Sequence, residues 1–219
     1  ACTSCAMASG WSPEGLYWES SLNFIFCVAK IRKTLTIAYI CTMTTEQLRG
    51  NIRVIEDFPV KGIHFQDVTT LFQNPECLKE LADRLTSLYK DKGITKIVGL
   101  ESRGFIMGAI LAERLGAGFV PARKKGKLPG EKISETYDLE YGTDTIEMHL
   151  GSINGDDVVL LHDDLLATGG TMAAACRLVS RMSPKKIYGN VLINLTACPR
   201  VPVFPKDLEL SSIIDIDID

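Results

Sequence analysis

The sequence lacks an excess of charge of either sign and lacks a hydrophobic run long enough to cross a membrane. Lys and Arg number 24 and Asp and Glu 27, a net charge of -3, so the charge balance gives no reason to expect nucleic acid as a partner. The apolar run 22–29 is too short to span a bilayer, and Lys30 ends it. With 46% hydrophobic residues, the composition predicts a soluble globular protein with no membrane or nucleic-acid partner.

The cysteines do not form a disulfide framework or a metal-binding pattern. There are seven, an odd number that cannot pair completely within one chain. Cys2 and Cys5 form a single C-x-x-C with no second half and no nearby histidine, so a zinc site is not favoured. The others stand singly, several in apolar surroundings as Cys176 does, which is typical of a reducing compartment. We therefore expect a cytoplasmic protein.

Residues 1–42 contain none of the chemical motifs found further along the chain. The order of charges around the run 22–29 does not fit a secretion signal, and no small-residue cleavage site follows it. Met43 opens the first stretch with the pattern of a folded domain. We expect 1–42 to be a non-catalytic extension, with a targeting peptide as the alternative, and 43–219 to form one domain.

From Thr44 onward, helical patterns alternate with apolar, β-rich runs. Helices are expected at 45–52, 77–90, 105–115 and 171–182, and strands at 94–100, 119–122, 158–162 and 187–195. A long polar loop is expected from 123 to about 137. This alternation predicts a parallel sheet flanked by helices on both faces, with ligands bound at the carboxyl ends of its strands. The turns 101–104 and 163–170 are therefore the candidate sites.

The turn after the strand 158–162 carries the most information. It begins with two adjacent acids, Asp163 and Asp164, and continues with small residues that open a helix. The N–H groups of such a turn and the helix dipole favour a bound monophosphate. The residues of this phosphate cradle are Ala167, Thr168, Gly169, Gly170 and Thr171. Acids beside a phosphate need another partner, such as ribose hydroxyls or Mg²⁺. A tight turn with capping acids is the alternative, and no Lys follows the glycines as in a Walker A loop.

The stretch 158–171 closely resembles the phosphoribosyl-pyrophosphate signature of the type I phosphoribosyltransferases. The resemblance implies that Asp163 and Asp164 hold the ribose hydroxyls and that the cradle holds the 5′-phosphate. It also implies Mg²⁺ as a cofactor, bound mainly through the substrate. His162 stands where that family has an aliphatic residue, and we assign it no catalytic role.

Three other segments resemble the adenine phosphoribosyltransferases in particular. Residues 52–69 are similar to their base-binding hood, 99–105 to their pyrophosphate loop, and 123–130 with 137–142 to their mobile catalytic loop. The resemblance implies an enzyme of purine salvage that converts adenine and 5-phosphoribosyl-1-pyrophosphate into AMP and pyrophosphate. It also implies a homodimer and a small amino-terminal hood beside the sheet. An enzyme for a 6-oxopurine and a regulator that senses phosphoribosyl pyrophosphate remain as alternatives.

The cationic residues are assigned to the pyrophosphate. Ser102 and Arg103 lie in a strand-end turn, where a guanidinium fork and backbone N–H groups can hold a pyrophosphate, and Arg103 is counted among the catalytic residues. Arg123 and Lys127 belong to the loop that would neutralise the leaving pyrophosphate. Surface charges in a solvated turn or loop would be the alternative for each.

The base is assigned to the hood and to the end of the catalytic loop. The resemblance implies that Phe65 stacks on adenine and that the main chains of His64 and Gln66 read its edge, although the family commonly has Arg at the position of Gln66. Glu140 and Tyr141 follow Leu139 in the Leu-Glu-Tyr segment and are assigned as catalytic. Glu140 would act as the general acid–base group near N7 of adenine.

Overall fold

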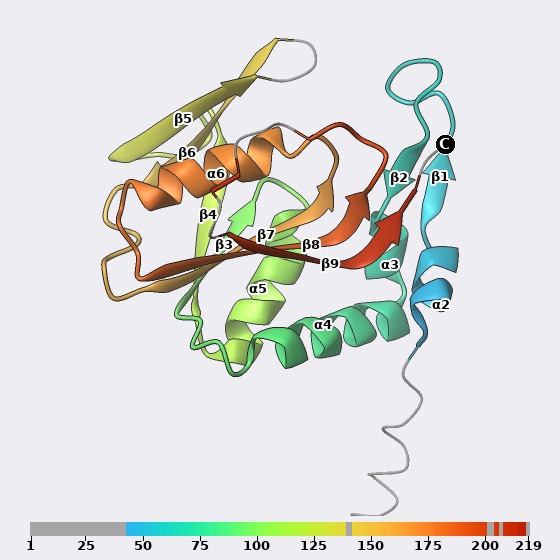
Figure 1. Cartoon of the computed structure of the whole chain (residues 1–219), viewed down its shortest axis with the longest axis horizontal. Coiled ribbons are helices and arrows are strands. Elements are labelled where there is room, and N and C mark those ends of the chain that lie inside the picture. Colours follow the sequence, from blue (N-terminus) through green and yellow to red (C-terminus); the bar gives the residue numbers. More distant parts are fainter. Residues whose placement is uncertain (1–42, 139–141, 201–203, 206–207, 218–219) are drawn as a thin grey trace, which may run out of the picture. The chain divides into compact units, whose positions relative to one another are not determined.

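A computed structural model describes residues 43–138, 142–200, 204–205 and 208–217 (Figure 1). The chain divides at Met43, and the description below concerns the second unit. The predictions for 1–42, Glu140 and Tyr141 fall outside the described residues. No helix in the described ranges combines the length and the apolar character needed to cross a bilayer.

A seven-stranded sheet with the order β5-β6-β4-β3-β7-β8-β9 forms the centre of this unit. Strands β4, β3, β7, β8 and β9 run parallel, whereas β6 pairs antiparallel with both β4 and β5. The strands are β3 Lys96–Leu100, β4 Gly118–Lys124, β5 Lys132–Asp138, β6 Thr143–His149, β7 Val158–Leu166, β8 Lys186–Leu195 and β9 Glu209–Ile216. The predicted parallel sheet is confirmed, and the hairpin β5–β6 extends it at one edge.

Helices cover both faces of the sheet, as predicted, with α6 on one face and α4 and α5 on the other (Figure 1). The helices are α2 Thr45–Gly50, α3 Thr69–Gln73, α4 Pro75–Tyr89, α5 Gly104–Leu115 and α6 Gly170–Ser180. Sequence signals explain several of their ends. Thr44 forms a capping box at α2, Asn74 caps α4, and Gly116 ends α5 in the left-handed conformation with φ 65°.

The hood is a two-stranded antiparallel sheet of β1 (Arg53–Ile55) and β2 (Phe65–Asp67). Asp67 anchors its end, because its carboxylate accepts a hydrogen bond from Thr69 Oγ1 over 2.6 Å and pairs with Arg53. The hydrogen bond from Thr69 and the contacts with Arg53 outweigh the effect of burial and lower the pKa of Asp67 to about 2. The hood therefore joins α3 through a fixed, charged turn.

The prediction of a polar loop from 123 to about 137 was wrong at both ends of that segment. Arg123 and Lys124 belong to β4, and β5 begins at Lys132. Strand β5 pairs with β6 along its whole length, from Lys132↔His149 to Asp138↔Thr143. The less exposed Ile133, Glu135 and Tyr137 alternate with the exposed Ser134 and Thr136, which is the period of a strand. Because Glu135 interrupts the apolar side of that pattern, hydrophobicity in the sequence did not reveal it.

Strand β7 is longer than predicted, and besides β5 two further strands of the seven-stranded sheet were not predicted. The acids Asp163 and Asp164 do not begin the turn, because β7 continues to Leu166 and pairs there with Asn194 of β8. The turn is thereby shortened to 167–169. Strand β6 and the edge strand β9 were both absent from the prediction. Polar and apolar residues are mixed in both strands, TDTIEMH and ELSSIIDI, so no continuous apolar run marks them in the sequence.

Each face of the sheet has its own hydrophobic core. Successive residues of a strand point to opposite faces, so β7 places Leu160 in the core under α4 and α5 and Leu161 in the core under α6. Both side chains are fully buried. Packing on both faces fixes the strand that leads into the phosphate cradle.

A chain of buried polar groups crosses the core on the α4 side. His162 Nδ1 lies 3.1 Å from Asn190 Oδ1, Asn190 Nδ2 donates to Ser211 Oγ over 3.0 Å, and Ser211 Oγ lies 2.7 Å from the hydroxyl of Tyr89. Since Asn190 donates through its nitrogen, its oxygen accepts, and the proton of the neutral imidazole is on Nδ1. Burial lowers the pKa of His162 to about 4. His162 thus belongs to the core.

His162 makes the stability of the fold depend on pH. Its pKa falls from 6.5 to about 4 on folding, so the unfolded chain takes up the proton first as the pH decreases. The stabilisation is complete above pH 6.5, and about 3 kcal/mol of it is lost as the pH falls to 4. Urea unfolding at a series of pH values should show this loss in the wild type and not in His162→Val. Parallel curves for the two proteins would contradict the assignment.

Candidate active site

Two helices begin at the carboxyl edge of the sheet without a capping side chain. Helix α5 follows β3, α6 follows the neighbouring β7, and neither has a side-chain cap or an acidic residue in its first turn. Away from this edge, α2 and α4 are capped by Thr44 and Asn74. An uncapped helix start presents free N–H groups and the positive end of the dipole to an external anion. The edge therefore has two neighbouring candidate sites for an anion.

Two glycines allow these helix starts to lie where they do. A Cβ atom on Gly104 would lie 2.7 Å from the carbonyl oxygen of His162 and 3.1 Å from Asp163 Oδ1, so only glycine lets α5 begin against the end of β7. Gly169, the N-cap of α6, has φ 88°, and a Cβ there would lie 2.7 Å from the ring of Phe204. The predicted cradle is thus the tight turn between β7 and α6.

The two predicted ribose-binding acids lie at the end of β7. Arg103 Nε is 2.7 Å from Asp164 Oδ2. This contact is an ion pair without hydrogen-bond alignment, because Asp164 Oδ2 has no hydrogen-bond partner in the described part of the chain. Burial, and then the neighbouring Asp164, raise the pKa of Asp163 well above its ordinary range. Each acid thus retains hydrogen-bonding capacity that a polyol could use.

Arg103 also reaches the hood. Its guanidinium carbon lies 5.3 Å from the ring centre of Phe65, the predicted stacking residue. Gln66 is buried, and its Nε2 donates to the carbonyl oxygen of the exposed His64 over 3.1 Å. A carbonyl oxygen has two lone pairs, so that of His64 can still accept from a ligand. The structure therefore brings the predicted base-binding and pyrophosphate-binding residues together.

Glu101, which was assigned no role from the sequence, pairs with both predicted loop cations. Its Oε2 lies 3.2 Å from Arg123 Nε and 2.9 Å from Lys124 N, and its Oε1 lies 2.8 Å from Lys127 Nζ. Burial alone would raise the pKa of Glu101, but the hydrogen bonds from Lys127, Lys124 and Arg123 outweigh it and lower the pKa to about 2. Arg123 and Lys127 are thereby held beside Glu101, the residue that precedes the exposed Ser102. The position of Glu101, a carboxylate directly after the buried strand β3, is the feature of the sequence that could have indicated this role.

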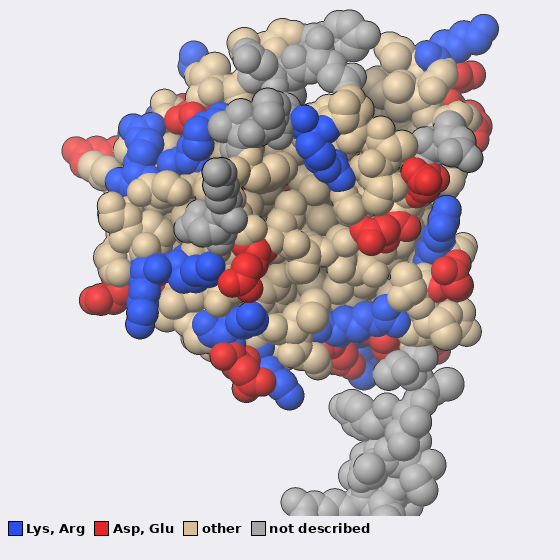
Figure 2. Space-filling view, viewed as in Figure 1, with Lys and Arg blue, Asp and Glu red and all other residues tan. Residues whose placement is uncertain are grey.

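Anion binding here depends on local geometry. Lys and Arg are interspersed with Asp and Glu on the face shown in Figure 2, in keeping with the net charge of -3. Of the predicted site residues, those of the hood, the pyrophosphate loop, the start of the catalytic loop and the cradle fall within the described chain. Glu140 and Tyr141 lie between β5 and β6, outside it.

The sequence matches the family of the phosphoribosyl transferase domain over residues 67–217. It is 60% identical over 174 residues to an adenine phosphoribosyltransferase of Phocaeicola vulgatus, a match that covers 80% of this chain and 100% of that protein. The chain belongs to the adenine phosphoribosyltransferase family. A wheat relative, adenine phosphoribosyltransferase 1 of Triticum aestivum, is 50% identical over 150 residues, which cover 68% of this chain and 83% of that protein.

Solved structures of adenine phosphoribosyltransferases have the same fold. The enzyme of Giardia lamblia in complex with 9-deazaadenine matches with a TM-score of 0.76 and 44% identity, over 81% of this chain and 100% of that one. The enzyme of Rhodothermus marinus matches with a TM-score of 0.74 and 45% identity, over 78% and 98%. The predicted family, the type I phosphoribosyltransferase fold and the enzyme class are confirmed.

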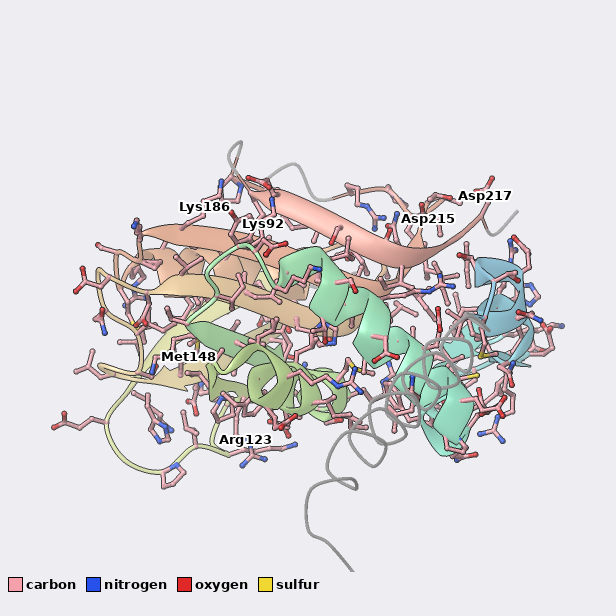
Figure 3. All side chains as sticks on the ribbon, turned by 90° about the horizontal axis from the view of Figure 1, so that it is seen from below. Lys92, Arg123, Met148, Lys186, Asp215 and Asp217 are labelled. Carbon is pink, nitrogen blue, oxygen red and sulfur yellow. The ribbon has the colours of Figure 1, made fainter. Side chains whose placement is uncertain are left out.

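The contacts of Glu101 predict its contribution to stability. The side chain of Glu101 is 9% exposed between two cations, so Glu101→Gln should lower the free energy of unfolding at pH 7 by about 1–3 kcal/mol. Glu209 is the matched control, because it is 58% exposed and also pairs with two cations, Lys92 and Lys186, which lie together in Figure 3. Glu209→Gln should change stability much less, because water screens its ion pairs. Urea unfolding of both variants checks this, and equal losses would contradict the difference.

Proposed function

We propose that this chain transfers the phosphoribosyl group of 5-phosphoribosyl-1-pyrophosphate to N9 of adenine, releasing AMP and pyrophosphate. The observation that carries the proposal is the pair of uncapped helix starts on neighbouring strands, with Asp163 and Asp164 at the end of β7. Two anion sites with carboxylates beside them fit a ligand that has a phosphate at one end, a pyrophosphate at the other and hydroxyls between. The identities of 60% and 50% to adenine phosphoribosyltransferases support adenine as the base.

The ligand replaces contacts that the protein makes with itself. The 5′-phosphate binds in the cradle, and the pyrophosphate binds at Ser102 and Arg103. Arg103 then leaves its ion pair with Asp164 and binds the pyrophosphate oxygens. Asp164 Oδ2 accepts a hydrogen bond from a ribose hydroxyl in its place. Arg123 and Lys127 likewise leave their ion pairs with Glu101 and bind the leaving pyrophosphate. Their positive charge there offsets the negative charge that develops on pyrophosphate as the C1′–O bond breaks.

Mg²⁺ is proposed to enter with the substrate. The residues that the structure describes contain no group of three or more His, Cys, Asp or Glu placed to hold a metal ion, whereas a pyrophosphate offers the oxygen ligands that Mg²⁺ prefers. The close carboxyl groups of Asp163 and Asp164 fit a cation nearby, because burial and their mutual repulsion raise the pKa of Asp163. When bound, Mg²⁺ supplies charge neutralisation at the pyrophosphate.

The base binds between the hood and the catalytic loop. Phe65 stacks on adenine once Arg103 has moved to the pyrophosphate, and the main chains of His64 and Gln66 read the edge of the ring. Glu140 acts as the general acid–base group near N7. It accepts the proton that adenine loses while N9 forms its bond to C1′ and the C1′–O bond to pyrophosphate breaks, and Tyr141 beside it helps to close the site. We further propose a cytoplasmic homodimer in which residues 1–42 take no part in catalysis. Among the described residues, the free thiols of Cys77 and Cys198 support a reducing compartment.

An assay with a panel of free bases tests the function. In the presence of phosphoribosyl pyrophosphate and Mg²⁺, adenine should be used about 10⁴-fold better than hypoxanthine or guanine, because a 6-oxopurine reverses the donor at C6 and the acceptor at N1 and leaves buried groups unpaired. The chain without residues 1–42, assayed in parallel, should give the same rates. Comparable use of hypoxanthine would favour the 6-oxopurine enzyme, and no turnover of any base would favour the regulator.

Glu140 should affect the chemical step more than substrate binding. General acid–base groups typically contribute roughly 10²–10⁴-fold, so Glu140→Gln should lower kcat by that factor and leave the KM for phosphoribosyl pyrophosphate within about twofold. Glu131→Gln is the control, since Glu131 is exposed next to the other end of β5. If both variants keep wild-type kcat, Glu140 has no part in the mechanism.

A further inference from the structure

One buried hydroxyl connects the phosphate cradle to the base of the catalytic loop. Tyr137 of β5 is 5% exposed. Its hydroxyl accepts from Thr171 Oγ1 over 3.1 Å and from Lys124 Nζ over 3.5 Å, and donates to Asp144 Oδ2 over 3.3 Å. These partners belong to α6, β4 and β6. A single oxygen therefore contacts three other elements, one of which begins at the cradle.

The protons of these groups are fully used in this arrangement. A phenol has one proton, which Tyr137 gives to Asp144, and a threonine hydroxyl has one proton, which Thr171 gives to Tyr137. Thr171 therefore directs its only proton away from the cradle. A phosphate bound at the start of α6 is a strong acceptor and needs donors. Thr171 can serve it only when its proton turns from Tyr137 to the phosphate.

The same contacts allow that change without leaving a buried group unpaired. Once the proton of Thr171 faces the phosphate, its oxygen is free to accept, and the hydroxyl of Tyr137 lies at hydrogen-bond distance to donate. Asp144 can release Tyr137, because it remains paired with Lys124 and accepts from Thr145 N over 2.7 Å. The hydrogen bond between Tyr137 and Thr171 then runs in the opposite direction.

We propose that Tyr137 is a positioning residue for the 5′-phosphate, orienting the hydroxyl of Thr171 towards the ligand by reversing the hydrogen bond between them. Asp144 accepts the hydrogen bond of the Tyr137 hydroxyl when Tyr137 does not donate to Thr171, and Lys124 donates to Tyr137 and stays paired with Asp144 in both arrangements. Phosphate binding is thereby coupled to β4 and β6, the strands next to the catalytic loop. The proposal rests on the proposed function, because it requires a phosphate ester in the cradle.

Calorimetric binding of ribose 5-phosphate tests the proposal separately from the adenine reaction, because this probe contains no base. Tyr137→Phe keeps the ring and removes only the hydroxyl, and should weaken binding about three- to tenfold. Tyr89→Phe is the matched control, since Tyr89 is also 5% exposed with a hydrogen-bonded hydroxyl. Tyr89→Phe should lose as much thermal stability as Tyr137→Phe does, and should leave the binding of ribose 5-phosphate unchanged.

A double-mutant cycle separates positioning from general destabilisation. Thr171→Val should weaken binding, and adding Tyr137→Phe to it should weaken binding no further, because the tyrosine acts only through the threonine hydroxyl. Thr171→Ser, which keeps the hydroxyl, should bind within about twofold of the wild type and stay sensitive to Tyr137→Phe. In turnover, Tyr137→Phe should raise the KM for phosphoribosyl pyrophosphate and leave kcat within about twofold.

Three results would overturn the inference. They are wild-type binding by Tyr137→Phe, the same additional loss in the Thr171→Val background as in the wild type, and an equal loss of binding in Tyr89→Phe. A failure of the proposed function has a different signature. It would show as no turnover of adenine while ribose 5-phosphate still binds and the double-mutant cycle still shows coupling.

Discussion

At the carboxyl edge of the sheet, the first residue of α5 lies against the last part of β7, with Gly104 in contact with the main chain of His162 and the carboxyl group of Asp163. The two uncapped helix starts, the acids and Arg103 all depend on this approach. A side chain at Gly104 would push α5 away from β7 and separate Ser102 and Arg103 from Asp163 and Asp164. Because β7 is packed on both faces, it could not move to compensate.

The candidate site is held together by ion pairs between its own residues. Arg103 pairs with Asp164, and Arg123 and Lys127 pair with Glu101. Each cation that is proposed to bind the substrate is thus already partly removed from water and held near the proposed pyrophosphate site. Exchanging one anionic partner for another costs less than ordering a solvated side chain, because much of the conformational entropy has already been lost. The same pairs keep the cations from repelling one another.

Local signals predicted much of the fold. Thr44 with Gln47, Asn74 with Pro75, and Gly116 mark helix ends through groups only a few residues apart, so the sequence reveals them. Strands with continuous apolar runs were also predicted. The pairing of β5 with β6 and the continuation of β7 through two acids were not, because they depend on partners in other strands. Pairing with a neighbouring strand, and the burial that comes with it, can outweigh the preference of two adjacent Asp residues for a turn.

The site shows the same division. The cradle and the pyrophosphate loop could be located because each is a continuous stretch at a strand end. The role of Glu101 could not, since it depends on β4 lying beside β3 in the register that pairs Leu100 with Ala122 and so brings Arg123 near Glu101. Tyr137 was missed for a related reason, because its partners come from three other elements.

The position of β9 at the end of the sheet bears on how the protein avoids aggregation. An outermost strand exposes backbone groups to which a strand of another molecule could add. Here the strand has acidic residues towards both ends, with Glu209 at its start and Asp215 and the adjoining Asp217 at the other end (Figure 3). Hydrogen bonds from Ser212 and Asn194 lower the pKa of Asp215, which keeps it charged. A strand that added to this edge would have to desolvate these charged side chains, so they oppose the growth of the sheet from one molecule to the next.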